Sequence, residues 1–420
     1  MAMGGKASSR ALRVLRKAAA LCAVTAVACV GPALADDLAA QRAAAHQLVR
    51  GQLPSGLLDY DMDFLAGTGF GSGTTTSEKR AFIARQASAA YGLAKYYEQT
   101  RDDAVREPLA KLIEALGELS LPIGKSTTQR LIESTRVLSL PVFRARIRDT
   151  LDARGLLYDA GGEGALVSYE RGYAAAWGGT TAMALLAELH YFRASGDARF
   201  APLRERWRIG LETLRVPGAG FRDYPDQIEE GPYTNGEAWL AFAVYVDTFP
   251  RGAVSLEDMR RIDDHMIQTY SSVFSNAFFH WGAMAASRRF ATSRDQRFAD
   301  FVETQAQKVL ETAAPTSAVN NTCPFLEGLA ASAATMASAG RRETEFYSTL
   351  HARVRAEMDS NNSLQLPPGL DRLAPARDAY LSSPHLADYA GAYLFGRSTA
   401  YVRIDMTHHC ISAIAEMQRG

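Results

Sequence analysis

The feature that most constrains this chain is a repeat with a period of 46 residues. Gly236, Gly282 and Gly328 are separated by 46 residues each, and each stands near the start of a stretch rich in small apolar residues. Gly178 and Gly179 hold the matching place one longer unit earlier. Self-similarity at a fixed period of this length is typical of repeat architectures, in which each unit is one supersecondary element.

Aspartates mark the same repeat independently. Asp102 and Asp197 are 95 residues apart, and Asp295 follows 98 residues later, so each interval is close to two units. An aromatic residue lies five positions before each aspartate. Aspartate at a helix start accepts hydrogen bonds from free backbone N–H groups. The pattern therefore predicts a turn between two helices in each unit.

Apolar spacing assigns the secondary structure. Beyond residue 36 no stretch shows sustained period-2 alternation, whereas many show apolar residues at i, i+3, i+4 and i+7, which indicates helices. The first helix of each pair is rich in Ala and Gly, which suits an inner ring with close helix approach, and the second is charged on one face, which suits an outer ring. The predicted pairs are 82–118, 126–154, 178–215, 236–270, 282–312 and 327–358, and the segment after Asp405 pairs with 36–50.

Six such pairs, or seven, predict an all-α (α/α)6 toroid that forms one domain over residues 36–420. The alternative is an open α-solenoid, in which each hairpin contacts only its neighbours along the chain. A closed ring accounts better for inner helices so rich in small residues.

The first 35 residues differ from the rest. They hold five basic residues and no acid, an apolar run from Ala18 to Val30, and Ala33-Leu34-Ala35 before Asp36. This combination predicts a secretory signal peptide over 1–35 and export to the periplasm or the extracellular space. An uncleaved anchor, a mitochondrial presequence and a lipoprotein anchored at Cys29 are the alternatives.

Cleavage changes the charge and the cysteine count. The full chain has 46 basic and 46 acidic residues, and the predicted mature chain of 385 residues carries a formal charge of −5. An acidic chain argues against nucleic acid as a partner. We also expect that this chain is not an integral membrane protein. Cys323 and Cys410 remain after cleavage, and in an exported chain they form a disulfide or stay as two buried thiols.

Several segments together resemble the (α/α)-toroid superfamily of carbohydrate-active proteins, which includes sugar epimerases, glycoside hydrolases and polysaccharide lyases. The similar segments are Gly178-Gly179-Thr180, Tyr233-x-Asn235-Gly236-Glu237-Ala238, His280-Trp281-Gly282 and Glu327-Gly328-Leu329. The resemblance covers most of residues 50–417 and matches no single family. It implies the architecture and a saccharide ligand, and fold analogy alone leaves the reaction open.

In a toroid the connections that lead into the inner helices converge on one mouth. The polar and aromatic residues at those starts are therefore the candidate site. The candidate catalytic residues are Glu237, His280, Asp405, Asp223 and Glu327, and the candidate substrate-binding residues are Trp177, Tyr224, Tyr233, Trp281, Arg403 and His408. Hydrolysis needs two carboxylates, such as Glu237 with Asp223 or Asp405. Epimerase or lyase chemistry needs a base, such as His280, His408 or His409.

Structural roles compete with these functions. Glu237 and Glu327 are also residues that favour helix N-termini, and Asp405 is also suited to a buried ion pair that closes the ring. No metal and no cofactor are predicted. A zinc site from Cys323, His409 and Cys410 is a minor alternative. Asp59-x-Asp61-x-Asp63 lacks the glycine and glutamate of an EF-hand, which leaves a looser calcium site or a solvated loop.

The sequence thus predicts an exported toroid that acts on a saccharide or polysaccharide as a hydrolase, epimerase or lyase. The alternative is a non-catalytic toroid of the cell envelope that binds a glycan or a protein partner.

Overall fold

The computed structural model describes residues 32–125, 158–170, 175–216, 218–225, 227, 229–312, 320–376 and 379–420. The side chains of 32–35, 125, 158–160 and 374–380 are left out of this description. The predicted helical pair at 126–154 lies outside the described residues.

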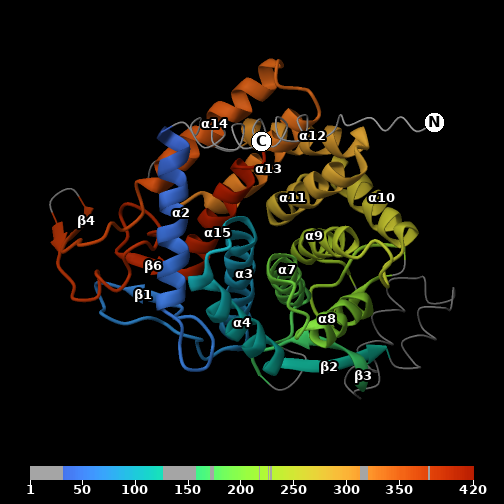
Figure 1. Ribbon diagram of the computed structural model, residues 1–420, viewed down its shortest axis with the longest axis horizontal. Helices are drawn as coiled ribbons and strands as arrows, with labels where there is room; N and C mark the ends of the chain where they lie inside the picture. The colour runs from blue at the N-terminus through green and yellow to red at the C-terminus, as the bar shows by residue number, and fades with distance from the viewer. Residues whose placement is uncertain are drawn as a thin grey trace, which may run out of the picture.

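Helices form two concentric layers (Figure 1). The inner helices are α3 (Thr76–Thr100), α7 (Gly178–Ser195), α9 (Pro232–Thr248), α11 (Asn276–Ser293), α13 (Cys323–Ser338) and α15 (Ile404–Met417). The outer helices are α2 (Pro32–Arg50), α4 (Asp103–Glu118), α8 (Ala201–Leu214), α10 (Leu256–Ser272), α12 (Gln296–Thr312) and α14 (Glu345–Asn362).

The inner layer is a closed ring. Each inner helix contacts the next, and α15 contacts α3, which completes the circle; α2 lies against α15 as the outer partner of the closing pair. The (α/α)6 prediction is therefore confirmed, and the open solenoid is wrong. The option of a seventh pair within the ring is also wrong, because α3 and α7 are in direct contact and leave no place between them.

Glycine allows the inner helices to approach closely. A Cβ atom on Gly236 would lie 2.7 Å from the Cβ of Trp281, and one on Gly328 would lie 2.9 Å from the Cα of His280. The glycines that mark the 46-residue repeat therefore stand where neighbouring inner helices meet. These contacts occur at similar depths along each helix, so neighbouring inner helices run in parallel.

Short turns join each inner helix to its outer partner. Asp102 caps α4 by accepting a hydrogen bond from the backbone N–H of Ala104, and Asp295 accepts one from Arg297. The residue directly before each of the three aspartates Asp102, Asp197 and Asp295 has the left-handed conformation that ends a helix. Its φ value is 55° for Arg101, 70° for Gly196 and 58° for Arg294. The aspartate markers of the sequence thus correspond to turns, as predicted.

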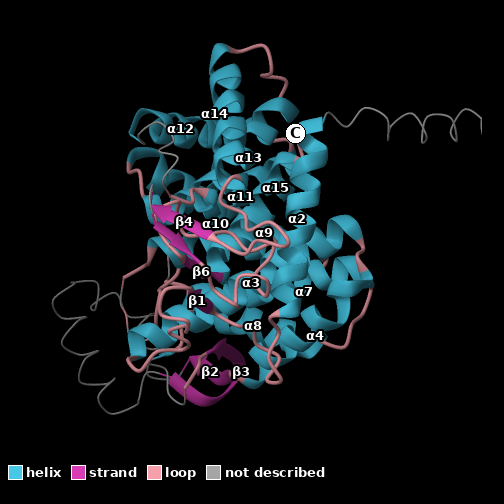
Figure 2. Ribbon diagram, turned by 90° about the vertical axis from the view of Figure 1, so that its left-hand side faces the viewer, coloured by secondary structure: helices cyan, strands magenta, loops and turns pink. Residues whose placement is uncertain are grey.

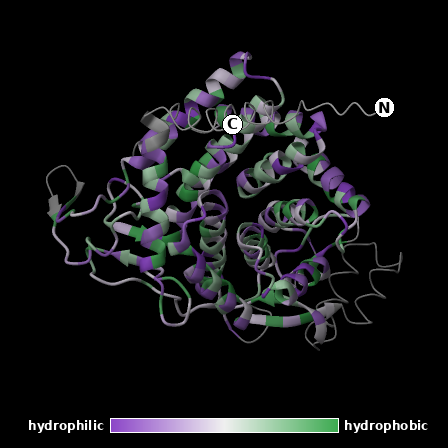
Figure 3. Ribbon diagram, in the orientation of Figure 1, coloured by the Kyte–Doolittle hydropathy of each residue, from purple (hydrophilic) through white to green (hydrophobic). Residues whose placement is uncertain are grey.

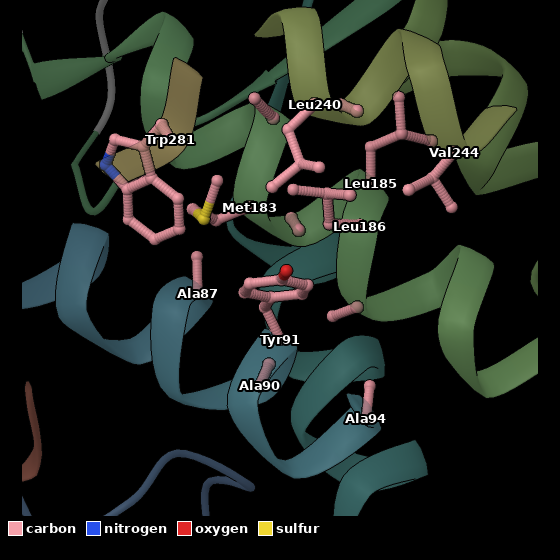
Figure 4. Packing of buried hydrophobic residues seen from close by; sticks show 14 of the residues in the cluster. Ala87, Ala90, Tyr91, Ala94, Met183, Leu185, Leu186, Leu240, Val244 and Trp281 are labelled. Carbon is pink, nitrogen blue, oxygen red and sulfur yellow. The ribbon is translucent and has the colours of Figure 1, made fainter. Parts of the chain in front are cut away.

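The core fills the centre of the ring. Tyr91 of α3 points towards Met183 and Leu186 of α7, and Trp281 of α11 lies beside Met183 (Figure 4). Hydrophilic segments are more frequent on outer helices such as α10 and α14 (Figure 3). The inner helices are buried on nearly all sides, which explains why they are rich in Ala and Gly.

The described strands lie on long connections that lead from an outer helix to the start of the next inner helix, whereas only residues 273–275 join α10 to α11. Strand β1 (Asp61–Asp63) pairs with β6 (Tyr401–Arg403), β2 (Ser120–Lys125) with β3 (Tyr158–Val167), and β4 (Leu373–Ala376) with β5 (Ala379–Leu381), all antiparallel. These strands lie outside the helical ring (Figures 1 and 2). Within the described residues, no helix has both the length and the apolar character needed to cross a membrane.

Candidate functional site

The predicted site residues gather at one end of the ring. Glu237, His280, Glu327 and His409 each lie four or five residues after the first residue of their inner helix, and Asp405 lies in the first turn of α15. All inner helices begin at this end, which we call the mouth. Helix N-termini carry partial positive charge, so the mouth favours anionic side chains and ligands.

Glu237 of α9 is buried and poorly solvated. Its side chain rests on α7, where a Cβ atom on Gly179 would lie only 1.8 Å from Glu237 Oε2. Oε2 has no hydrogen-bond partner within the described part of the chain. Burial, helped by the negative charge of Asp223, raises the pKa of Glu237 well above its usual value. Glu237 therefore stays protonated at pH values where an exposed glutamate is charged.

Asp223 faces the start of α9 from the preceding connection. Its Oδ1 accepts hydrogen bonds from the hydroxyl of Thr234 at 2.7 Å and from the backbone N–H of Thr234 at 3.3 Å. The indole of Trp177 donates to the same oxygen at 3.4 Å. Asp223 thus caps α9 and also supplies a negative charge close to Glu237.

Aromatic rings surround these two acids. The ring centroid of Trp177 lies 6.2 Å from that of Tyr224 and 6.0 Å from that of Tyr233, and the guanidinium of Arg80 lies over the Tyr224 ring. Tyr233 remains 43% exposed. Burial, with the charges of Glu237 and Asp223, raises the pKa of Tyr233. Partly exposed aromatic faces beside acids are surfaces on which sugar rings stack and hydroxyl groups hydrogen-bond.

A second group lies across α11, α13 and α15. Nδ1 of His409 is 2.7 Å from Oε2 of Glu327, and the ring centroid of His280 is 5.8 Å from that of His409. Trp281 is buried beside both histidines. Burial, with a contribution from His409, lowers the pKa of His280 well below its usual value, so its imidazole is neutral.

Neither Glu237 nor Glu327 caps a helix. Glu237 Oε2 has no hydrogen-bond partner among the described residues, and Glu327 contacts His409 of a different helix. A preference of glutamate for helix starts therefore does not explain these two side chains.

Asp405 forms ion pairs. It accepts two hydrogen bonds from Arg403 at 2.7 Å each and one from Nε of Arg85 in α3 at 2.9 Å. Burial alone would raise the pKa of Asp405, but the hydrogen bond from Arg403 and the charges of both arginines outweigh it and hold the pKa below its usual range. Asp405 is therefore charged, and it joins α15 to α3 where the ring closes. This arrangement matches the structural alternative for Asp405.

His408 is buried against α3, on the same side of α15 as Asp405. A Cβ atom on Gly92 of α3 would lie 3.0 Å from the Cβ of His408, so the two helices meet here. Burial, together with the charge of His409, lowers the pKa of His408 well below its usual value. With 1% of its surface exposed, His408 has little contact area for a substrate.

Cys323 and Cys410 form a disulfide that joins the start of α13 to α15, with 4.9 Å between the Cα atoms. The disulfide prediction is confirmed. The zinc site built from Cys323, His409 and Cys410 is wrong, because both sulfur atoms are bonded to each other.

The Asp59-x-Asp61-x-Asp63 segment organises loops. Asp61 accepts hydrogen bonds from the backbone of Phe70 and from the hydroxyl of Tyr401, and Asp63 accepts one from the backbone of Leu65. Among the described residues these aspartates form no group with metal-ligand geometry. The looser calcium site therefore finds no support.

Sequence reasoning missed some residues at the mouth. Arg85 lies 320 positions from Asp405, and only ring closure brings the two together. Exposed Phe70 and Phe395 lie beside Tyr401, with ring centroids 6.0 and 6.3 Å from it. Both phenylalanines lie on connections without a repeat pattern, and large apolar side chains in such loops were the only available signal.

Solved structures with the same architecture are known. An α-1,6-mannanase, GH76A from Salegentibacter sp. HEL1_6, matches with a TM-score of 0.54 and 12% identity over 91% of this chain and 99% of that chain. An unsaturated glucuronyl hydrolase specific for heparin matches with a TM-score of 0.53 and 9% identity over 91% and 96% of the two chains. An endoglucanase from the termite Nasutitermes takasagoensis matches with a TM-score of 0.52 and 12% identity over 91% and 99%.

An inactive variant of the same mannanase has been solved in complex with α-1,6-mannotetrose. No protein-family model matches the sequence, and the search of curated proteins found no match. The matching structures show that this chain has an (α/α)-toroid fold. The resemblance inferred from the sequence is confirmed at the level of the fold.

Proposed function

We propose that this protein is an exported glycoside hydrolase that cleaves a saccharide or polysaccharide at the mouth of the toroid. The proposal rests mainly on Glu237. This buried carboxyl group has a pKa that is raised by burial and by the charge of Asp223. A protonated acid beside a charged one is the pair that glycosidic cleavage requires.

In this mechanism Glu237 is the general acid. It donates its proton to the glycosidic oxygen as the bond to the anomeric carbon breaks, and positive charge develops on the sugar ring. Asp223 supplies negative charge for that transition state and acts as the base or nucleophile of the pair. Trp177, Tyr224 and Tyr233 provide the surface on which the sugar rings stack.

The matching structures support a saccharide substrate, since each is named as an enzyme of glycan breakdown. Epimerase or lyase chemistry through His280 is less well supported, because burial lowers the pKa of His280 well below its usual value and so makes it a weaker base. A glycan-binding module without turnover is an outcome of the test below.

Export also belongs to this proposal. The disulfide between Cys323 and Cys410 suits an oxidising compartment. Asp37, the second residue after the proposed cleavage site, is buried and hydrogen-bonded to Arg355 and Asn362. A mature chain that begins at Asp36 keeps these contacts. A lipoprotein anchored at Cys29 and a protein partner in the envelope remain predictions from the sequence alone.

The test is product release from a polysaccharide panel. The panel contains α-1,6-mannan, unsaturated heparin disaccharides and a glucan, followed by other plant, fungal and bacterial glycans, and new reducing ends are measured. We expect the mature protein to cleave one class and the Glu237→Gln variant to lose roughly 10²–10⁴-fold in rate. The Asp223→Asn variant should lose activity as well.

Glu188→Gln is the matched control. Glu188 of α7 is fully buried, and burial raises its pKa to about 8 despite the nearby Arg204. It lies ten residues after Gly178, the first residue of α7, and therefore deeper in the ring. Loss of its 2.7 Å ion pair with Arg204 lowers stability but leaves the mouth intact. Glycan binding without turnover in the wild type, or equal activity in the Glu237→Gln variant, would refute the hydrolase proposal.

A further inference from the structure

His280, Glu327 and His409 form a cluster that the proposed hydrolytic pair does not use. One ligand atom from each side chain lies within 4.8 Å of the others. The three residues come from three successive inner helices, α11, α13 and α15. Two imidazoles and one carboxylate are a ligand set that zinc commonly binds in proteins when a further coordination position stays open.

The carboxylate in this cluster lacks compensation. Glu327 is fully buried, and His409 is its only ion-pair partner in the part of the chain that the structure describes. Its second oxygen, Oε1, is buried without a hydrogen-bond partner. A buried carboxylate with one oxygen unsatisfied is costly, because no hydrogen bond from the described residues replaces the hydration of that oxygen.

His280 is likewise available as a ligand. Its ring forms no hydrogen bond with the described residues, although its residue is only 7% exposed. The side chain of His409 retains 12% exposure, so the cluster is reached from the mouth. A cation placed among the three groups would satisfy Glu327 Oε1 and both histidines at once.

The surrounding fold holds the ligands in place. The disulfide joins Cys323, one turn before Glu327, to Cys410, which follows His409 directly. Gly328 allows α13 to approach the backbone of His280 in α11. A covalent link and a close helix contact therefore fix the spacing of all three ligand-bearing helices, as a metal site requires.

We propose that His280, Glu327 and His409 bind one divalent transition-metal ion of the zinc class at the mouth of the ring. The three protein ligands leave at least one coordination position for water or for a ligand oxygen. None of these ligands is Glu237 or Asp223, so the metal-binding proposal can be tested independently of the proposed hydrolysis.

The test is metal binding by the mature protein without an affinity tag. The protein is treated with EDTA, dialysed and titrated with Zn²⁺ and, separately, with Co²⁺, whose visible absorption reports a ligand field of nitrogen and oxygen atoms. Bound metal is counted by mass spectrometry after removal of free ions. We expect one ion per chain, a rise in melting temperature on binding, and competition between Zn²⁺ and Co²⁺ for the same site.

Variants locate the site. His280→Ala, Glu327→Gln and His409→Ala should each lose the bound ion, and His280→Ala should do so with little change in fold because its ring forms no hydrogen bond with the residues that the structure describes. His265→Ala is the control: this histidine of α10 also pairs with a glutamate, Glu230, at 2.7 Å. Absence of stoichiometric binding in the wild type, or binding that survives in the His280→Ala and His409→Ala variants, would overturn the proposal.

Discussion

At the scale of single residues, burial and a neighbouring negative charge distinguish Glu237 from an ordinary glutamate at a helix start. Sequence alone placed it at the start of an inner helix, where acids are stabilised. The structure adds burial against Gly179 and the nearby charge of Asp223. These features depend on how α7 and α9 approach each other, which no local pattern encodes.

The raised pKa of Glu237 has a measurable effect on stability. Between its usual value of 4.5 and its folded value, the native state binds more protons than the unfolded state, so the free energy of unfolding falls as pH rises. The decrease attributable to Glu237 is at most about 1.36 kcal/mol per pH unit. Urea unfolding of the wild type and the Glu237→Gln variant at pH 4 to 8 measures it. The difference in stability should shift steadily in favour of the variant, and parallel curves would contradict the assignment.

Gly179 offers a second test at this scale. A methyl group at this position would overlap Glu237 Oε2, and the flexible end of that side chain would have to move. Gly179→Ala should therefore displace the acid by about 1 Å and reduce kcat/KM roughly 100-fold, with little loss of melting temperature. Gly51→Ala, whose added Cβ meets only ordinary contacts at 3.5 Å and beyond, is the control. Full activity in the Gly179→Ala variant would show that the position of Glu237 is unimportant.

Some of the remaining site residues could be placed from the sequence around them, and others could be placed only from the closed ring. Trp177 and Tyr233 stand at helix starts, so the hairpin pattern was sufficient to place them at the mouth. Arg85 pairs with Asp405 across the seam of the ring, and Asp405 therefore forms an ion pair that its own neighbourhood in the sequence could not reveal. Such partnerships require the closed ring.

At the scale of elements, the repeat is regular only in part of the chain. The successive inner helices α9, α11 and α13 begin at Pro232, Asn276 and Cys323, close to the 46-residue period. Between α3 and α7 the β2–β3 ribbon is inserted, and between α14 and α15 the described residues include the strands β4, β5 and β6. The pattern therefore predicted the helices well, whereas strands of three to ten residues without alternating apolar positions gave no signal.

The disulfide should stabilise the contact between α13 and α15. It closes a segment with a sequence separation of 87 residues, and for a loop of that size the entropic estimate is roughly 4 to 5 kcal/mol. The Cys323→Ala/Cys410→Ala double variant should melt at a lower temperature than the oxidised wild type. Thermal unfolding with and without a reductant checks this directly.

Reductant should lower the melting temperature of the wild type towards that of the double variant and leave the variant unchanged. If the wild type melted at the same temperature in both conditions, the disulfide would make no contribution to the stability of the ring.

At the scale of the whole molecule, α2 closes the ring from outside. Asp37 forms an ion pair with Arg355 of α14, and Gln41 donates a hydrogen bond to the carbonyl of Ile411 in α15. Nε2 of His46 lies 2.7 Å from Oδ2 of Asp102. One helix thus links the last hairpins to the first. The sequence predicted this pairing, because only 36–50 remained without a partner once the hairpins had been assigned.

A closed ring and an open solenoid respond differently to loss of a terminal helix. An open solenoid loses the contribution of one unit, since each repeat contacts only its neighbours. Deletion of 36–50 from the mature chain should instead broaden or abolish the single unfolding transition, because both sides of the seam lose their outer support. Chemical denaturation followed by circular dichroism and by tryptophan fluorescence measures the cooperativity. Arg42→Ala, at a side chain that is 68% exposed, should behave like the wild type.

If Glu237 is the general acid of a glycoside hydrolase, as we propose, the effect of replacing it should depend on the leaving group of the substrate. Aryl glycosides of the sugar that the panel identifies are prepared with leaving groups of high and low pKa, and kcat/KM is measured for the wild type and the Glu237→Gln variant. We predict a large loss for poor leaving groups, which need a proton, and little loss for good ones, which do not. An equal loss for every leaving group would contradict the assignment of Glu237 as the proton donor.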